Sequence, residues 1–78
     1  MRQGQITLLE REILLYISSF RKRKGYPPTF REIADAVGLK SASSVQLHLE
    51  QMERAGFIKR DRYKSRTIAV SAAGRSLL

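Results

Sequence analysis

Apolar side chains recur every three or four residues in the first third of the chain, which is the spacing of one face of an α-helix. Residues Thr7–Glu10 have the form of a capping box, so this helix is predicted to begin at Thr7. A run of four cations suits its last turn, and Gly25 is predicted to end it. The apolar stripe consists of Leu9, Ile13, Tyr16, Ile17 and Phe20.

The same start signal returns after two prolines that cannot continue a helix. A second capping box spans Thr29–Glu32, and Gly38 predicts the end of a short helix. Ser41 is a good N-cap for a third helix, which Gly56 is predicted to terminate. The side chains expected to face the core from the third helix are Val45, Leu49 and Met52. Two helices joined by a short glycine-containing turn have the outline of a helix-turn-helix.

The periodicity changes after Gly56. Residues Phe57–Ile58 and Thr67–Val70 are short aromatic or β-branched runs, which are typical of strands. The segment between them, Lys59–Arg66, is polar and charged. The pattern therefore predicts a β-hairpin with a basic tip.

The last residues are predicted to form a short turn or helix. Ser71 can cap it, and Leu77 and Leu78 are expected to pack back on the first helix. Residues 1–78 are therefore expected to form a single domain of the α+β class, mainly α. Its predicted fold is a winged helix-turn-helix with a three-helix core and a two-stranded wing.

Composition narrows the classes of function. With 0 Cys and one His, disulfides are excluded and a structural zinc site is not expected. The longest apolar run, Ile13–Ile17, is far short of the roughly 20 residues that span a bilayer, and no signal peptide is visible, so a cytoplasmic protein without a membrane segment is expected. No nucleophile, phosphate loop or carboxylate pair points to an enzyme or a cofactor, and His48 is interpreted as a partly buried, hydrogen-bonded residue.

Charge is the strongest compositional signal. The net charge is +8, and the isoelectric point is near 10.7. Two short segments, Arg21–Lys24 and Lys59–Arg66, together carry a charge equal to the whole net charge. Such a concentration is typical of nucleic-acid binding, although a solvated basic surface and an acidic membrane or protein partner also fit it. Arg21–Lys24 is interpreted first as a complement to the helix terminus.

The outer face of the third helix carries candidates for reading DNA bases. Small serine side chains allow close approach to a groove, and their hydroxyls can bind phosphate or base edges. Gln46 has the amide geometry to read adenine, and Leu47 can lie against a thymine methyl group. The predicted base contacts are Ser41, Ser43, Ser44, Gln46 and Leu47. Serines are also common in first helical turns, and one exposed leucine needs no special explanation.

The cations at the hairpin tip suit a polyanion, either at the phosphate backbone or in the minor groove. Lys40 and the start of the second helix at Thr29 are expected to hold the DNA backbone as well. The predicted backbone contacts are Thr29, Lys40, Arg62, Lys64 and Arg66.

These motifs carry a resemblance to a known family. Residues Gly25–Ile33 (GYPPTFREI) and Val37–Ser41 (VGLKS), followed by Val45 and His48-Leu49, resemble the DNA-binding domain of LexA-type SOS repressors. The resemblance covers about residues 6 to 70. It implies a three-helix core, a β-hairpin wing, and a third helix in the major groove of a palindromic DNA operator, with a homodimer on the DNA. The family's base-reading positions fall on the third-helix residues given above, and its wing positions fall on 62–66.

Two departures from the family pattern bear on function. Gln46 and Leu47 differ from the residues that several LexA-like proteins hold there, so the standard operator is not assumed. LexA-type repressors continue into a peptidase domain with a Ser/Lys dyad, whereas this sequence stops at Leu78. It is interpreted either as a fragment or as a stand-alone regulator.

Two other classes of function stay open. A winged helix can serve as a protein-interaction module, in which case Leu47 and the outer helix face would meet a protein partner. Binding to structured RNA is the second alternative. It is disfavoured because Tyr63 is the only aromatic residue among the basic wing positions.

Overall fold

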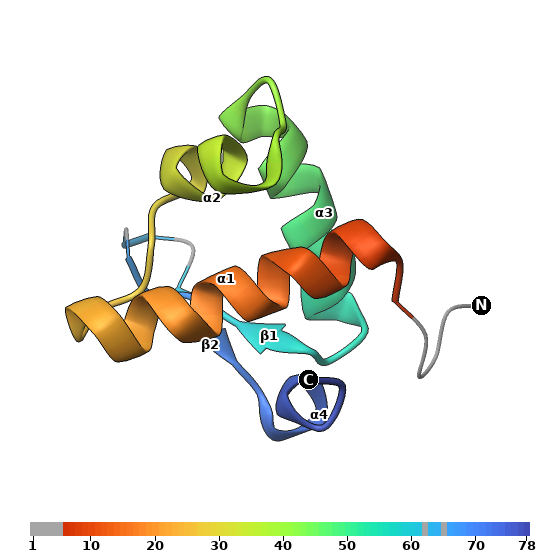
Figure 1. The fold of residues 1–78 in the computed structure, drawn as a ribbon. Helices are drawn as coiled ribbons and strands as arrows, with labels where there is room; N and C mark the ends of the chain where they lie inside the picture. Colours follow the sequence, from red (N-terminus) through yellow and green to blue (C-terminus); the bar gives the residue numbers. More distant parts are fainter. Residues whose placement is uncertain (1–5, 62, 65) are drawn as a thin grey trace.

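A computed structural model describes residues 6–61, 63–64 and 66–78 of the chain. Three helices come first, α1 (Leu8–Lys24), α2 (Phe30–Val37) and α3 (Ala42–Arg54). The two strands β1 (Ile58–Lys59) and β2 (Ala69–Val70) and the short helix α4 (Ala72–Arg75) follow. Figure 1 shows α1 crossing the molecule, with α2 and α3 on one side of it and the strands and α4 below. This arrangement confirms the predicted winged helix-turn-helix.

The helices begin and end where the local signals predicted. Thr7 and Thr29 are the N-caps of α1 and α2, and both capping boxes are complete, with the glutamate three residues later bonded back to the cap. Ser41 caps α3 by accepting a hydrogen bond from the Ser44 backbone N–H at 3.3 Å. Gly38 lies in the left-handed region at φ 80°, where an L side chain is strained, and this allows the tight turn between α2 and α3.

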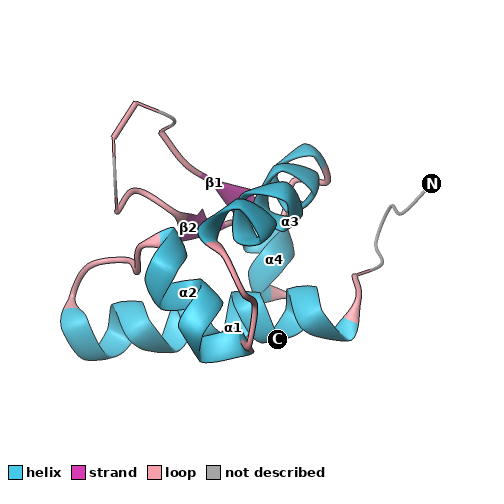
Figure 2. Cartoon of the chain, turned by 90° about the horizontal axis from the view of Figure 1, so that it is seen from above, coloured by secondary structure: helices cyan, strands magenta, loops and turns pink. Residues whose placement is uncertain are grey.

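The two strands of the wing are shorter than the sequence predicted. Ile58 pairs with Val70 and Lys59 with Ala69 in an antiparallel register, and Phe57 and Thr67 lie outside the ladder. The Thr67 hydroxyl instead accepts a hydrogen bond from the Asp61 backbone N–H at 2.9 Å. This side-chain bond replaces cross-strand backbone pairing, so the rest of the segment forms a loop that projects beyond the strands (Figure 2).

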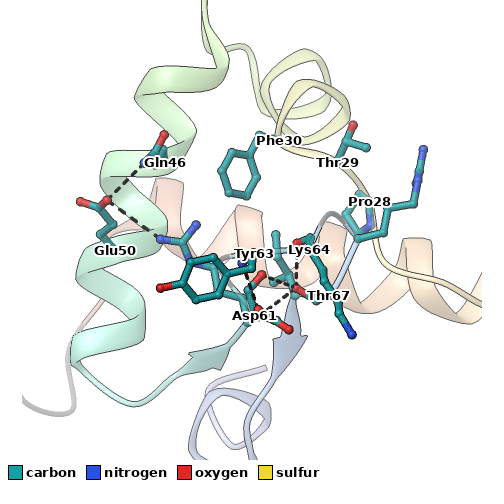
Figure 3. Close-up of a pocket in the computed structure, with 12 residues that line it drawn as sticks. Pro28, Thr29, Phe30, Gln46, Glu50, Asp61, Tyr63, Lys64 and Thr67 are labelled. Carbon is teal, nitrogen blue, oxygen red and sulfur yellow. Dashed lines mark hydrogen bonds and ion pairs between the residues drawn. The ribbon is translucent and has the colours of Figure 1, made fainter.

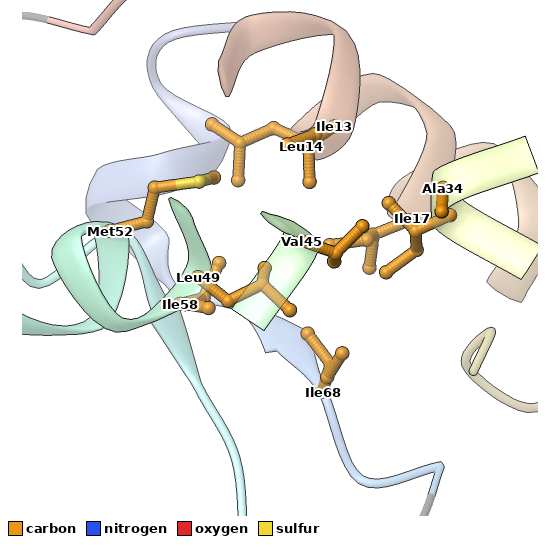
Figure 4. Close-up of a cluster of buried hydrophobic side chains, with 10 residues drawn as sticks. Ile13, Leu14, Ile17, Ala34, Val45, Leu49, Met52, Ile58 and Ile68 are labelled. Atoms are coloured by element: carbon orange, nitrogen blue, oxygen red, sulfur yellow. The ribbon is translucent and has the colours of Figure 1, made fainter. Parts of the chain in front are cut away.

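One hydrophobic core joins the helices to the wing. Met52 and Leu14 are fully buried, and Ile58 and Ile68 bring the wing into the same cluster (Figure 4). Leu14 is outside the predicted stripe of α1, because α1 packs against both α2 and β2 and therefore buries a wider face than one stripe. The buried cluster consists of Ile13, Leu14, Ile17, Ile33, Ala34, Val45, Leu49, Met52, Ile58 and Ile68.

The C-terminal turn forms as predicted, and Leu77 packs against the core. Ser71 caps α4, and the Leu77 carbonyl accepts a hydrogen bond from Arg11 Nε of α1 at 3.3 Å. Leu78 is 38% exposed, and its packing on α1 stays a prediction. Helix α4 is a single turn.

Replacing Met52 by alanine tests the phase of α3. Because Met52 is 0% exposed at the centre of the core, Met52→Ala should lower the free energy of unfolding by about 2–5 kcal/mol. Leu47→Ala on the opposite face, where the side chain is 64% exposed, should change it by less than about 0.5 kcal/mol. Thermal or denaturant melts measure both, and equal effects would show that α3 is packed in a different rotation.

Candidate nucleic-acid interface

The outer face of α3 is open to solvent. Ser43, Gln46 and Leu47 are exposed and stand three and four residues apart, so they share one helix face. The buried residues Val45 and Leu49 point to the core on the other side. Three of the five predicted base contacts therefore lie together on an accessible surface.

The remaining two serines are partly engaged within α3. Ser41 and Ser44 are half-buried, and their hydroxyl oxygens lie 3.3 Å apart at the helix start. The Ser41 hydroxyl oxygen also accepts a hydrogen bond from the Ser44 backbone N–H and so caps the helix. Ser43 is thus the most accessible of the three serines.

A groove of about 460 Å³ separates α3 from the wing loop. Gln46 and Glu50 of α3 line one wall, and Tyr63 and Lys64 line the opposite wall (Figure 3). The start of α2 lies at the same groove through Thr29. The remaining lining residues are Pro28, Phe30, Arg60, Asp61, Arg66, Thr67 and Ile68. Helix α3 and the basic loop therefore border one concave surface.

The exposed part of the loop is built around a local turn. The Asp61 carboxylate accepts a hydrogen bond from the Tyr63 backbone N–H at 2.9 Å, and the Tyr63 side chain is 97% exposed. Lys64 is exposed beside it. Arg62, one of the predicted backbone contacts, lies outside the described residues.

Arg60 does not behave as a solvated wing cation. Its side chain is only 7% exposed and pairs with Glu53 at 3.3 Å. The sequence interpretation, in which the cations at the hairpin tip suit a polyanion, did not include this internal partner of Arg60. The partner lies on α3, seven residues earlier in the chain, and its charge offsets that of Arg60 within the fold.

Arg66 joins the far end of the loop to α2. Its Nη1 donates to Glu32 Oε1 at 3.0 Å and to the Pro27 carbonyl at 3.1 Å. The guanidinium also lies over the Tyr26 ring, 4.8 Å from its centroid. Arg66 adopts a left-handed backbone conformation, with φ at 55°. The predicted phosphate contact at Arg66 remains a prediction, but this side chain already has a carboxylate partner.

Glu32 therefore serves two elements. Its carboxylate accepts a hydrogen bond from the Thr29 backbone N–H at 2.8 Å, which completes the capping box, and it pairs with Arg66. The Thr29 backbone bond, and then the Arg66 bond, hold the pKa of the Glu32 carboxyl below its ordinary value of 4.5. Thr29, a predicted DNA-backbone contact, is half-buried at the groove, and Lys40 is exposed in the turn before α3.

His48 lies at the edge of the buried face, as expected, and its Nδ1 atom is buried. This buried atom makes no hydrogen bond to any described residue and stands 3.7 Å from Glu10 Oε2. The Glu10 side chain accepts the Thr7 backbone N–H in the capping box of α1, which directs its Oε1 toward the helix start. His48 on α3 therefore lies next to the buried carboxyl group of Glu10 on α1.

Comparison with known proteins identifies the family. Residues 3–67 match the family described as the LexA DNA binding domain. The chain belongs to this family. A LexA repressor of Clostridium kluyveri is 61% identical over 59 residues, which cover 76% of this chain and 29% of that protein. The LexA repressor of Shouchella clausii is 51% identical over 71 residues, covering 91% of this chain and 34% of that protein.

The chain thus spans about a third of the length of the LexA repressors it matches. The shared part is the DNA-binding region, and the peptidase region implied for the longer family members has no counterpart in residues 1–78. Among the described helices, none combines the length and the apolar character that crossing a bilayer requires.

Three site features were not predicted from the sequence. They are the Glu32–Arg66 ion pair, the stacking of Arg66 on Tyr26, and the contact of Arg60 with α3. The hydrogen bond between Gln46 and Glu50 was not predicted either. It had a local signal in the sequence, because residues four apart on a helix are neighbours.

The lowered pKa of Glu32 predicts a pH dependence of stability. Because the folded state favours the charged carboxylate, its contribution is present above about pH 4.5 and is lost as the pH falls through the folded pKa. Glu32→Gln should be less stable than the wild type at pH 7, and the difference should shrink toward pH 3. Denaturant melts across this range measure it, with Glu12→Gln, an exposed carboxylate on α1, as the control. A difference that is constant with pH would contradict the role of the Glu32 charge.

Proposed function

We propose that this chain binds duplex DNA at specific sequences and acts as a transcriptional repressor. The observation that carries the proposal is the shared groove, where the exposed face of α3 and the basic wing loop border one surface. A convex helix beside a cationic loop can enter the major groove while the loop reaches the phosphate backbone or minor groove. The LexA repressors that match the chain have names that support the same activity.

In this proposal, α3 reads the bases. Gln46 forms the bidentate contact to adenine N6 and N7, and Leu47 lies against a thymine methyl group. Ser43 contacts a base edge or phosphate directly, while Ser41 and Ser44 act at the helix start, where unpaired backbone N–H groups attract phosphate.

In this proposal, groups from three parts of the fold hold the DNA backbone. Lys40 precedes α3, Thr29 begins α2, and Lys64 extends from the wing loop. Arg62 and Arg66 are proposed to complete the wing contact. Because these groups meet phosphate, they add affinity that falls with salt and carries no sequence preference.

One copy of so small an interface binds weakly, and we therefore propose that two copies occupy an inverted repeat. The second half-site on the same DNA face raises the overall affinity through effective concentration. Residues 1–78 would act as one DNA-binding domain, in the bacterial cytoplasm where the operator lies.

Selection of bound sequences from random duplex DNA tests the proposal. We expect enrichment of a short half-site that recurs as an inverted repeat at fixed spacing. Enrichment that is lost in competition with a structured RNA, or the absence of any enriched sequence together with binding that salt does not affect, would contradict it and favour an RNA or a protein partner.

Gln46→Ala should relax base preference at one position of the selected half-site. Removing a bidentate contact costs about 1–3 kcal/mol of discrimination at that base pair and leaves the other positions unchanged. Competition binding with duplexes that carry each base at every position measures the effect. A preference identical to that of the wild type would remove Gln46 from the reading face.

Lys64→Ala should weaken binding to all duplexes alike and reduce the slope of log K against log salt by about one unit. The control is Arg75→Ala on α4, an exposed cation that is not among the groove residues, and its slope should equal the wild-type slope. If Lys64→Ala and Arg75→Ala give the same slope, the wing loop does not contact phosphate through Lys64.

A further inference from the structure

Arg60 is a cation of the wing segment that the fold turns toward the helices. Its guanidinium lies 3.3 Å from Glu53 and 4.0 Å from Glu50, both on α3, and 5.5 Å from the centroid of the Phe30 ring on α2. Only 7% of its side chain is exposed. Arg60 therefore connects the end of β1 to the two helices of the helix-turn-helix.

The pairing has an electrostatic consequence for α3. A cation buried in this way is stable only when it is paired, and here two carboxylates share it. Arg60 offsets part of the negative charge that Glu50 and Glu53 place on the helix proposed to approach phosphates. Arg60 thus offsets repulsion while only 7% of its side chain is exposed.

The network continues to the reading face. Gln46 Nε2 donates a hydrogen bond to Glu50 Oε2 at 3.3 Å, and the same oxygen is the one nearest to Arg60 (Figure 3). A carboxylate only accepts hydrogen bonds, so the nitrogen of the Gln46 amide has to face Glu50. The second hydrogen on Nε2 and the oxygen Oε1 then remain available, and these are the donor and the acceptor that a bidentate contact to adenine uses.

We infer that Arg60 is a positioning residue for base recognition: it holds Glu50, and Glu50 fixes the orientation of the Gln46 amide. The inference rests on the proposed function of α3 as the reading helix. Arg60, at the start of the wing loop, then contributes to sequence preference, in addition to the phosphate contacts proposed for the loop. The inference also predicts a different effect for Arg60 than for the neighbouring cations. Loss of a positioning residue changes which base is preferred and leaves the number of phosphate contacts unchanged.

The test measures base preference and salt slope for the full 78-residue chain and four variants. Arg60→Met keeps an unbranched side chain over Phe30 but cannot hold Glu50. Glu50→Gln leaves Arg60 in place and introduces an amide that can donate as well as accept, so Gln46 can bind it in either orientation. Gln46→Ala defines the base position concerned. Lys59→Met is the matched control, because it removes one exposed cation from β1 beside Arg60.

We expect Arg60→Met and Glu50→Gln each to reduce discrimination at the position set by Gln46 by about 5-fold or more. Combining either with Gln46→Ala should add no further loss at that position, since all three act through one contact. Their salt slopes should equal the wild-type slope, and Lys59→Met should leave base preference unchanged. A thermal melt shows whether Arg60→Met is folded; if it is not, Glu50→Gln decides, since Glu50 is 29% exposed and outside the core.

Unchanged discrimination in Glu50→Gln and folded Arg60→Met would overturn the inference while leaving the proposed function intact. A salt slope reduced by about one unit in Arg60→Met, with base preference retained, would also overturn it, because Arg60 would then be a phosphate contact. Failure of the proposed function looks different, since the wild type itself would then enrich no sequence.

Discussion

The placement of the wing depends on ion pairs at both of its ends. Two paired positions form the whole β-ladder, and a hairpin of that length has little stability of its own. Arg60 anchors the start of the loop to α3 through Glu53, and Arg66 anchors its return to α2 through Glu32. These contacts, together with Ile58 and Ile68 in the core, set the distance between the loop and α3 and so the width of the groove.

The basic segment therefore contains cations that are paired within the fold and cations that are exposed. The arginines at the loop's ends, Arg60 and Arg66, are turned toward carboxylates of the helix-turn-helix, whereas Lys64 between them is exposed to solvent. A loop that was cationic along its whole length would repel itself, and the two anchors relieve part of that repulsion. Lys64 keeps an exposed positive charge where the loop borders the groove.

The sequence predicted what depends on neighbours along the chain. Capping boxes at Thr7 and Thr29, the N-cap at Ser41 and the turn at Gly38 are local chemistry, and each was found at its predicted residue. The exposed positions of Gln46 and Leu47 followed from helical periodicity alone. The partners of Arg66 and His48 did not, because Glu32 and Glu10 are 34 and 38 residues away along the chain and only packing brings them close. The extent of the strands was overestimated for a related reason, since the hydroxyl of Thr67 competes with backbone pairing in a way that residue type does not reveal.

The position of the tyrosines has a practical consequence. The chain contains 0 Trp and 3 Tyr, and their environments differ widely: Tyr63 is 97% exposed on the loop, Tyr26 lies under Arg66, and Tyr16 is half-buried on α1. Replacing Tyr16 and Tyr26 by phenylalanine would leave a single emitter at the wall of the groove. In that variant Tyr63 would be an intrinsic fluorophore on the wing loop, so binding at the groove could be followed without an attached dye.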